Sequence, residues 1–408
     1  MRNIITASLI LTSLYVSAQN SSSSPYSTYG IGIINERTTS LNRSLGGTGI
    51  GIQDNANLNT MNPASYLSIS QPVTHVFEIG MYAENNRYTT NAMNVSKING
   101  GLSNINYWFR FKPGWASVLG LSPYSSVSYD ILTTKTVADN SKANYRYTGS
   151  GNISQLYWGN AFKIFNNFSA GVHLSYLFGS INRSESITGS GTEGLQLDDK
   201  IFTNKLSIDY GIQYRMPFKN HRSLIWGATF QNGLKLNGNS DLTLYNTDGD
   251  TLTSQAGTNT DYKMPRTVGS GISFRTKRSL IAADAVFRQW SKASYSTSDK
   301  TFQDTWRMSL GYSYLGNENA ESYLGLISLK AGVYMQNHYM KIRGNSITNY
   351  GFSFGAGIPV LDGKSTINLT YNYDNFGTTS NNLIQQRTQK FMLDIVIRDL
   401  WGYKRRFD

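Results

Sequence analysis

Apolar and polar residues alternate along most of this chain with a period of two. In the final stretch, KFMLDIVIRDLWGYKRRFD from Lys390, the odd positions from Phe391 to Ile397 are apolar, whereas Asp394 and Arg398 fall on the other side. Such a strand fits the wall of an outer-membrane β-barrel, where one face meets lipid and the other meets the lumen. The same alternation recurs at 168–178, 206–214, 306–314 and 350–358.

This pattern predicts fourteen strands, an even number as in bacterial outer-membrane barrels. We expect them near residues 73–83, 102–112, 114–134, 152–164, 168–180, 203–216, 223–237, 265–275, 279–290, 304–315, 324–337, 348–360, 365–375 and 389–401.

The connections between these strands alternate in length. Short ones fall near 112–114, 166–167, 217–222, 276–278, 316 and 361–364, whereas 180–200 and 235–263 are long, polar and rich in Ser, Thr, Asn and Gly. Short periplasmic turns and long extracellular loops are typical of such barrels. A soluble β-sandwich would share the strand pattern but has no reason to segregate loop lengths. We therefore predict an all-β fold, a 14-stranded antiparallel transmembrane β-barrel over residues 73–408, whose last strand pairs with the first near Val73.

The first residues have the features of a secretory signal peptide. Arg2 precedes an apolar run from Ile4 to Val16 and a small-residue ending, so we expect residues 1–18 to be cleaved before Gln19 and the protein to reach the outer membrane. A buried first helix is the alternative. The chain contains no Cys, which excludes a lipid-anchored cysteine, disulfides and thiolate metal sites.

Composition narrows the class of protein. The chain is 39% hydrophobic and has 27 Tyr, 38 Gly and only 8 Pro, which suits many strands with aromatic girdles and tight turns. The net charge of +12 suggests nucleic acid as a partner. However, the Lys and Arg residues are scattered along the chain and form no single tract. Outer-membrane lipid is therefore the expected partner, and nucleic acid is not. The terminal Lys404–Phe407 stretch fits either an anchor at lipid headgroups or a docking tail.

Residues 19–72 do not fit the wall, because they are rich in Gly, Asn and small residues and alternate only weakly. We expect them to fold into the lumen as a hatch or plug. A disordered periplasmic tail is the alternative.

Three segments resemble the FadL-type outer-membrane transporters of hydrophobic compounds. RSLGGTGIGIQDNANLNTMNPASY resembles that family's hatch signature, which ends at Asn62, Pro63 and Ala64. MPRTVGSGISFRTKRSLIAADAVFRQWSKASY and FQDTWRMSLGYSY are similar to a hairpin and to the strand that follows it. The resemblance implies a hatch-blocked barrel that hydrophobic ligands enter from outside and leave laterally through a break in the wall.

Ser122 and Pro123 are the candidate site of such a lateral opening, because Pro removes a ladder hydrogen bond and marks an edge, bulge or kink. An ordinary bulge near the rim is the alternative. The extracellular loops lack the long apolar hairpin that captures ligands in fatty-acid transporters. Relatives of the same fold include the PorV-like proteins of the type 9 secretion machinery of Bacteroidetes.

Charged residues on the polar side of the strands should face the lumen, because Arg or Lys facing lipid at mid-membrane costs roughly 2–4 kcal/mol. These candidate lumen charges are Glu78, Asp209, Asp284, Arg307, Lys330, Asp394 and Arg398. The four histidines lack ligand spacing, so we expect no metal, and GGTGIG lacks the Lys-Ser or Lys-Thr of a phosphate loop. A Ser-His-Asp hydrolase around His173 is a minor alternative.

We expect no enzymatic activity and no cofactor. The leading hypothesis is passive, hatch-gated passage of a hydrophobic small molecule or lipid, with such a ligand, or detergent, bound in the lumen. The alternative is a non-transporting accessory subunit of an outer-membrane complex, either type 9 secretion or barrel-assembly machinery.

Overall fold

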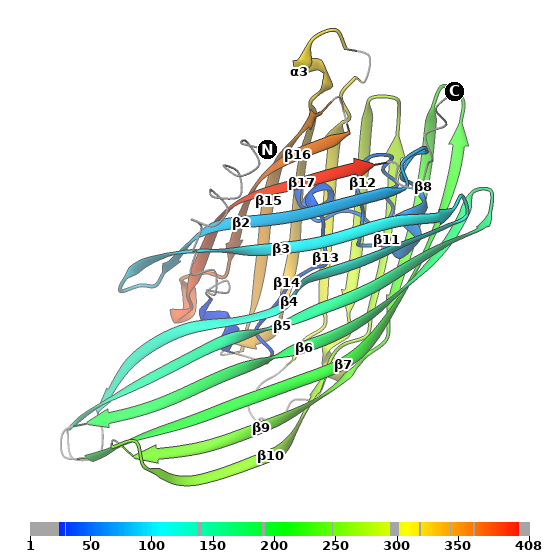
Figure 1. Ribbon diagram of the computed structural model, residues 1–408. Coiled ribbons are helices and arrows are strands. Elements are labelled where there is room, and N and C mark those ends of the chain that lie inside the picture. Colours follow the sequence, from blue (N-terminus) through cyan, green and yellow to red (C-terminus); the bar gives the residue numbers. More distant parts are fainter. Residues whose placement is uncertain are drawn as a thin grey trace, which may run out of the picture.

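The computed structural model describes residues 24–28, 30–136, 141–189, 192–246, 248–293, 302–317, 320–342, 344–361 and 364–399. They form a closed antiparallel barrel with a 14-strand wall, as the sequence predicted (Figure 1). The expected signal peptide and the basic stretch 404–407 lie outside the described residues.

Most of the described chain is in strands. Their bounds are β1 Ile33–Ile34, β2 His75–Thr89, β3 Asn94–Lys112, β4 Trp115–Thr136, β5 Lys142–Phe165, β6 Phe168–Gly189, β7 Thr192–Phe218, β8 Arg222–Gln231, β9 Lys235–Asn246, β10 Thr251–Lys263, β11 Thr267–Arg275, β12 Ser279–Arg288, β13 Thr305–Tyr314, β14 Ser328–Ile342, β15 Asn345–Val360, β16 Ser365–Phe376 and β17 Gln385–Asp399. The helical elements are short: η1 Pro25–Thr28, α2 Ser40–Ser44, η2 Pro63–Leu67, η3 Trp290–Lys292, α3 Tyr323–Leu326 and η4 Ser380–Asn382. No described helix is long and apolar enough to cross a membrane.

The last strand closes the barrel onto the first wall strand. β17 and β2 pair over their whole lengths, from Gln385 opposite Thr89 to Asp399 opposite His75. The closure expected near Val73 is therefore confirmed, with pairing that begins two residues later. At this seam no sheet edge is left open to the bilayer, where an unpaired backbone group would cost several kcal/mol.

Two segments that the sequence predicted as long polar loops are strands instead. Residues 180–189 and 192–200 extend the β6–β7 pair, and residues 235–246 and 251–263 form the β9–β10 hairpin, which continues β8 and β11 and pairs with β7. Figure 1 shows β4–β7, β9 and β10 projecting as a sheet beyond one end of the barrel. The prediction failed because Ser, Thr, Asn and Gly, which usually favour turns, are tolerated in a strand whose neighbours supply the hydrogen bonds.

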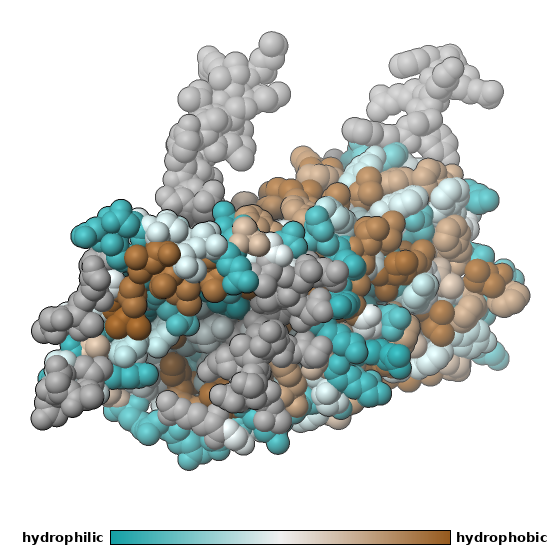
Figure 2. Space-filling view, turned by 90° about the horizontal axis from the view of Figure 1, so that it is seen from below, coloured by the Kyte–Doolittle hydropathy of each residue, from teal (hydrophilic) through white to brown (hydrophobic). Residues whose placement is uncertain are grey.

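The wall strands turn their apolar faces outward. In β13, Met308 and Leu310 are 59% and 51% exposed, whereas Arg307 and Ser309, which alternate with them, are buried. Broad apolar patches cover much of the surface seen in Figure 2, with hydrophilic residues among them. Apolar residues outside and polar residues inside are the reverse of the arrangement in a soluble protein, and a lipid-facing surface requires this reversal.

Residues 24–74, called here the N-terminal segment, lie inside the barrel, as the blue chain in Figure 1 shows. Leu41, Leu45, Ile52, Leu58 and Tyr66 are at most 1% exposed. Glycines permit the close fit: Gly46 has a positive φ of 68°, and a Cβ there would lie 2.8 Å from the backbone of Val333. The glycine run read as a region of tight turns therefore also lets the segment touch the wall.

Candidate functional site

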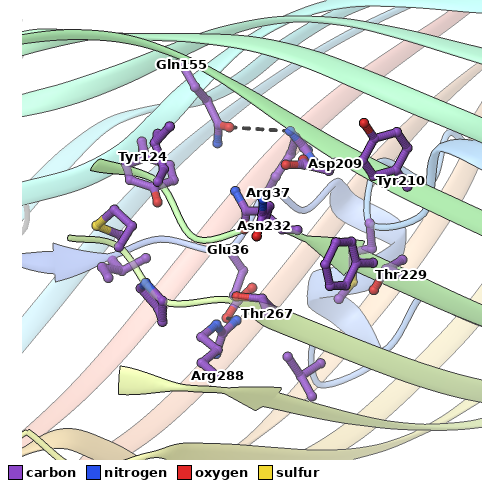
Figure 3. Close-up of a pocket in the computed structure, with 18 of the residues that line it drawn as sticks. Glu36, Arg37, Tyr124, Gln155, Asp209, Tyr210, Thr229, Asn232, Thr267 and Arg288 are labelled. Carbon is purple, nitrogen blue, oxygen red and sulfur yellow. Dashed lines mark hydrogen bonds and ion pairs between the residues drawn. The ribbon is translucent and has the colours of Figure 1, made fainter. Parts of the chain in front are cut away.

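Arg37 of the N-terminal segment joins three wall strands inside the barrel (Figure 3). Its guanidinium forms an ion pair with Asp209 on β7 and donates to His173 Nδ1 at 2.8 Å and to Ser175 Oγ at 3.1 Å on β6. A longer bond of 3.5 Å reaches Gln155 on β5. Charge-assisted bonds of this kind are about twice as strong as neutral ones, so Arg37 holds the segment firmly to the wall.

His173 also contacts Tyr66 in η2, and so connects Arg37 with that residue. Because arginine only donates hydrogen bonds, Nδ1 of His173 accepts, and the proton of the neutral ring lies on Nε2, which faces the Tyr66 hydroxyl. Trp108 on β3 donates from Nε1 to the Tyr66 carbonyl at 2.9 Å. His173, Tyr66 and Trp108 are all fully buried. The histidine therefore forms a structural bridge between Arg37 and Tyr66.

Glu36 pairs with Arg288 at the end of β12, on the opposite side of the segment from Asp209. Burial raises the pKa of Glu36, but the positive charges of Arg288 and Arg307 outweigh this effect and lower the pKa below its ordinary value. The carboxylate is therefore ionised. The adjacent residues Glu36 and Arg37 attach the segment to two sides of the lumen, through Arg288 and Asp209 respectively.

Arg43 makes the corresponding contact on the other side of the barrel. It donates to Asp394 Oδ1 on β17 at 3.2 Å, and to Ser103 and Asn104 on β3 at 3.1 and 2.8 Å. Nearby, the Ser40 backbone N–H donates to Glu78 on β2 at 3.3 Å. These bonds attach α2 to the strands that close the barrel.

The remaining candidate lumen charges contact the glycine-rich part of the segment. Asp284 Oδ2 accepts from the backbone N–H groups of Gly49 and Ile50 at 2.6 and 2.8 Å, and Arg307 donates to the Gly46 carbonyl at 2.8 Å. Arg398 donates to the Ala56 carbonyl at 3.1 Å. Lys330 is buried and bonds to Ser328 at 3.2 Å instead. Six of the seven candidate charges thus hydrogen-bond directly to the N-terminal segment.

The Asn62-Pro63-Ala64 motif starts η2 and sits against the wall. The Asn62 side chain caps the helix by accepting from the Ala64 N–H at 3.0 Å, and donates to the carbonyls of Ile50 and Ile212 at 2.9 and 3.0 Å. A Cβ at Gly171 on β6 would lie 2.5 Å from the Pro63 carbonyl carbon. The motif therefore makes a close backbone contact with the wall.

Ser122 and Pro123 lie where β3 and β4 separate. The pairing of these strands ends at Ile105 opposite Leu121, and a register shift between Pro123 and Ser125 interrupts the pairing with β5. Beyond that point β1 of the N-terminal segment pairs with β4 at Ser125 and Ser126. The segment thus occupies the edge of β4 that β3 leaves.

Two cavities lie inside the barrel. A small one of about 140 Å³ surrounds Glu36, Arg37 and Asp209 near the break between β8 and β9 (Figure 3). A larger one of about 1570 Å³ opens at the end that carries the short turns, with residues 53–57 of the N-terminal segment among its lining. The segment separates these spaces.

The anchors on the N-terminal segment were missed by the sequence analysis. Arg37 and Arg43 are the main cations of a stretch otherwise made of small and polar residues, and that isolation was the available signal. Among the four histidines, His75 bonds to Tyr107 and His338 lies beside Met340, both far along the chain from His173. Within the described ranges no group of three or more His, Asp or Glu side chains is placed to hold a metal ion.

The fold defines the class of protein: this is a 14-stranded outer-membrane β-barrel that shares its fold with the FadL-type channels. The monoaromatic hydrocarbon channel CymD aligns with a TM-score of 0.59 at 13% identity, covering 90% of this chain and 98% of that one. A FadL homologue of Pseudomonas aeruginosa gives 0.59 at 11% identity, covering 89% and 99%. The toluene transporter TodX of P. putida gives 0.58 at 15%, covering 89% and 98%.

At these identities the likeness concerns the fold. The chain belongs to the BamG family, whose family model matches residues 1–408. No curated protein matches the sequence. The FadL-type resemblance is therefore confirmed for the fold, while the relation to PorV-like proteins stays a prediction.

Proposed function

We propose that this protein is a closed, non-conducting barrel that serves as a subunit of an outer-membrane protein assembly, with the barrel-assembly machinery as the first candidate. The observation that carries the proposal is the anchoring of the N-terminal segment. Its bonds to charged groups reach strands on all sides of the wall, including Asp209, Asp284 and Asp394. Each such bond contributes roughly 1.5–3 kcal/mol, so displacing the segment as a unit breaks several at once. This favours a permanent plug over a gate.

The interior of the barrel supports the same proposal. Ligand pockets are mostly apolar and have volumes of roughly 300–1,000 Å³. The cavity beside the segment is about 140 Å³, and charged groups, including Glu36, Arg37, Asp209 and Arg288, are among its lining. A space of this volume is too small for a hydrophobic cargo of that size, and the four charged groups in its lining do not favour one. The match to the BamG family model adds to the argument, because it hints at a complex.

In this proposal residues 1–18 direct export, residues 19–72 are the plug and residues 73–408 form the wall in outer-membrane lipid. No enzymatic activity is assigned, and the channels that share the fold are not enzymes. The sheet that projects beyond the barrel, β4–β7 with β9 and β10, gives partner subunits a surface outside the membrane (Figure 1).

The decisive experiment is purification from native membranes in a mild detergent, followed by native mass measurement. An assembly subunit should be recovered with outer-membrane partners in fixed stoichiometry. Recovery of the barrel alone, with or without a bound lipid, would contradict the proposal.

Hatch-gated passage of a hydrophobic compound is the second candidate. The parting of β3 and β4 at Ser122 and Pro123 favours it, as does the fold shared with hydrocarbon channels. In this version a ligand leaves laterally where β1 now covers β4. Liposomes that contain the Ile33→Pro variant, whose β1 can no longer pair with β4, should then take up a fluorescent hydrophobic tracer faster than liposomes that contain the unchanged protein. Equal rates would remove this candidate.

A further inference from the structure

The cavity at the short-turn end, called here the vestibule, is the larger of the two spaces described above. It measures about 1570 Å³ and is bounded by the turns at 166–167 and 276–278, by the loop that carries α3, and by the ends of the wall strands. Residues 53–57 of the N-terminal segment line it as well. It is thus a cup that is open at one end and closed by the segment.

Cations dominate this lining. Seven of the described lining residues carry a positive charge: Lys163, Arg215, Arg275, Lys277, Arg278, Lys330 and Arg398. Asp54 is the only carboxylate among those described lining residues. By contrast, the sheet at the opposite end mixes the two signs, as in the Asp130–Arg146 ion pair. The positive charge is therefore concentrated in the vestibule.

The negative charge of the single carboxylate, Asp54, is already balanced by neighbouring groups. Asp54 lies 3.7 Å from Arg275 and accepts from the N–H groups of Ala56 and Asn57 at 2.9 and 2.7 Å. Burial raises the pKa of Asp54, but the charge of Arg275 and these bonds lower it overall. One negative charge thus faces seven positive ones, and the vestibule retains a large positive excess.

The cations form an inner and an outer set. Arg275, Lys330 and Arg398 are buried or half-buried and contact the N-terminal segment or Ser328. The outer set, which is exposed, consists of Lys163, Arg215, Lys277 and Arg278. A concave low-dielectric site lined by one sign of charge focuses its field and attracts the opposite sign.

We propose that the vestibule binds an acidic, extended peptide segment of a periplasmic partner. The shape of the site favours a peptide over the anionic headgroups of the bilayer, because the cations that face the lumen are separated from lipid by the wall itself. The size agrees, since 1570 Å³ exceeds the range of small-molecule pockets and suits several residues of an extended chain. The outer cations attract the segment, and Arg275, Lys330 and Arg398 lie at the bottom to pair with its carboxylates.

This inference deepens the proposed function by giving the chemistry of one partner, and rests on it for biological meaning. The test uses the isolated barrel, so failure to bind a peptide and failure to recover an assembly are separate results. The full chain would be placed in phosphatidylcholine nanodiscs, and binding of a fluorescent oligoglutamate of about ten residues would be followed by anisotropy in about 50 mM salt.

The informative variant is Lys163→Glu with Arg215→Glu, which reverses two exposed charges in the vestibule. Its matched control is Lys135→Glu with Lys142→Glu, which makes the same change on the projecting sheet at the other end. We expect the vestibule variant to weaken binding by about tenfold or more and the control by less than about twofold, because only the former changes the local field. Binding should also weaken steeply in about 500 mM salt.

Several results would overturn the proposal. Equal weakening by both variants would mean that net charge alone attracts the peptide. Full displacement by millimolar inorganic phosphate would reveal a simple anion site, and displacement by phosphatidylglycerol in the nanodisc would assign the cations to lipid. If the vestibule variant fails to fold, the turn variant Lys277→Glu with Arg278→Glu gives the same comparison, and unchanged binding there rejects the proposal.

Discussion

Arg43 and Asp394 are 351 residues apart in the chain and 3.2 Å apart in the barrel. The first belongs to the N-terminal segment and the second to the strand that closes the wall. Asp394 is completely buried, and the side chain of Arg43 is 10% exposed. A buried ion pair therefore joins the N-terminal segment to the wall, at the strand that closes the barrel.

Removing one partner of this pair should be costly. Arg43→Met leaves Asp394 buried without its cation, and breaking a buried pair in this way costs about 3–5 kcal/mol. We expect a marked fall in thermal stability, measured by the heat-induced shift in gel mobility. The double variant Arg43→Met with Asp394→Asn should recover part of the loss. As control, Arg146→Met breaks an exposed pair with Asp130, and we expect little change in thermal stability because such pairs are screened by water.

Deleting residues 24–72 should open the lumen. The segment separates the two internal cavities and supplies most of the contacts across the barrel, so the shortened protein should conduct ions in planar bilayers while the full chain does not. Shortening the β9–β10 turn at 248–250 is the control, and should leave conductance unchanged. A conducting full-length protein would refute the plug.

Gly171→Ala should loosen the Asn62-Pro63-Ala64 motif. Its Cβ would lie 2.5 Å from the Pro63 backbone, a separation that real structures do not show. The N-terminal segment should become cleavable by protease added from the short-turn side. Gly114→Ala is a matched control, because its Cβ meets only Lys163 at 3.7 Å. Equal protection of both variants would show that the motif is not seated there.

Leu310→Arg tests the orientation of the wall. Leu310 is 51% exposed in the middle of β13, and an arginine facing lipid at that depth should cost roughly 2–4 kcal/mol. The loss would be measured by denaturant unfolding in liposomes. The same substitution at Leu324, which is 77% exposed in α3 outside the wall, should be nearly neutral. A neutral Leu310→Arg would place this face away from lipid.

Alternation along the strands was sufficient to predict the wall, since a two-residue period follows directly from one face in lipid and one in the lumen. It also placed Asp284 and Asp394 on the inner face, where the structure has them. The projecting β9–β10 hairpin was not predictable in this way, because neither of its faces is enclosed by lipid and its residues carry no periodic apolar signal.

The anchors of the candidate site were harder to predict for a different reason. Arg37 and Arg43 act through partners on distant strands, such as Asp209 and Asp394, and their pairing depends on the three-dimensional path of the segment. The alternation of apolar and polar positions was enough to find the charged residues that point inward from the strands. It gave no information about which residues of the N-terminal segment they would contact. The concentration of cations in the vestibule likewise arises only when five separate parts of the sequence meet at one end.

Closure by β17 against β2 constrains the order in which the molecule is made. The N-terminal segment leaves the secretion machinery first, whereas the strand that seals the ring arrives last. Arg43 cannot meet Asp394 until that final strand is in place. The last step of closing the wall is therefore also the step that completes the attachment of the segment at this point.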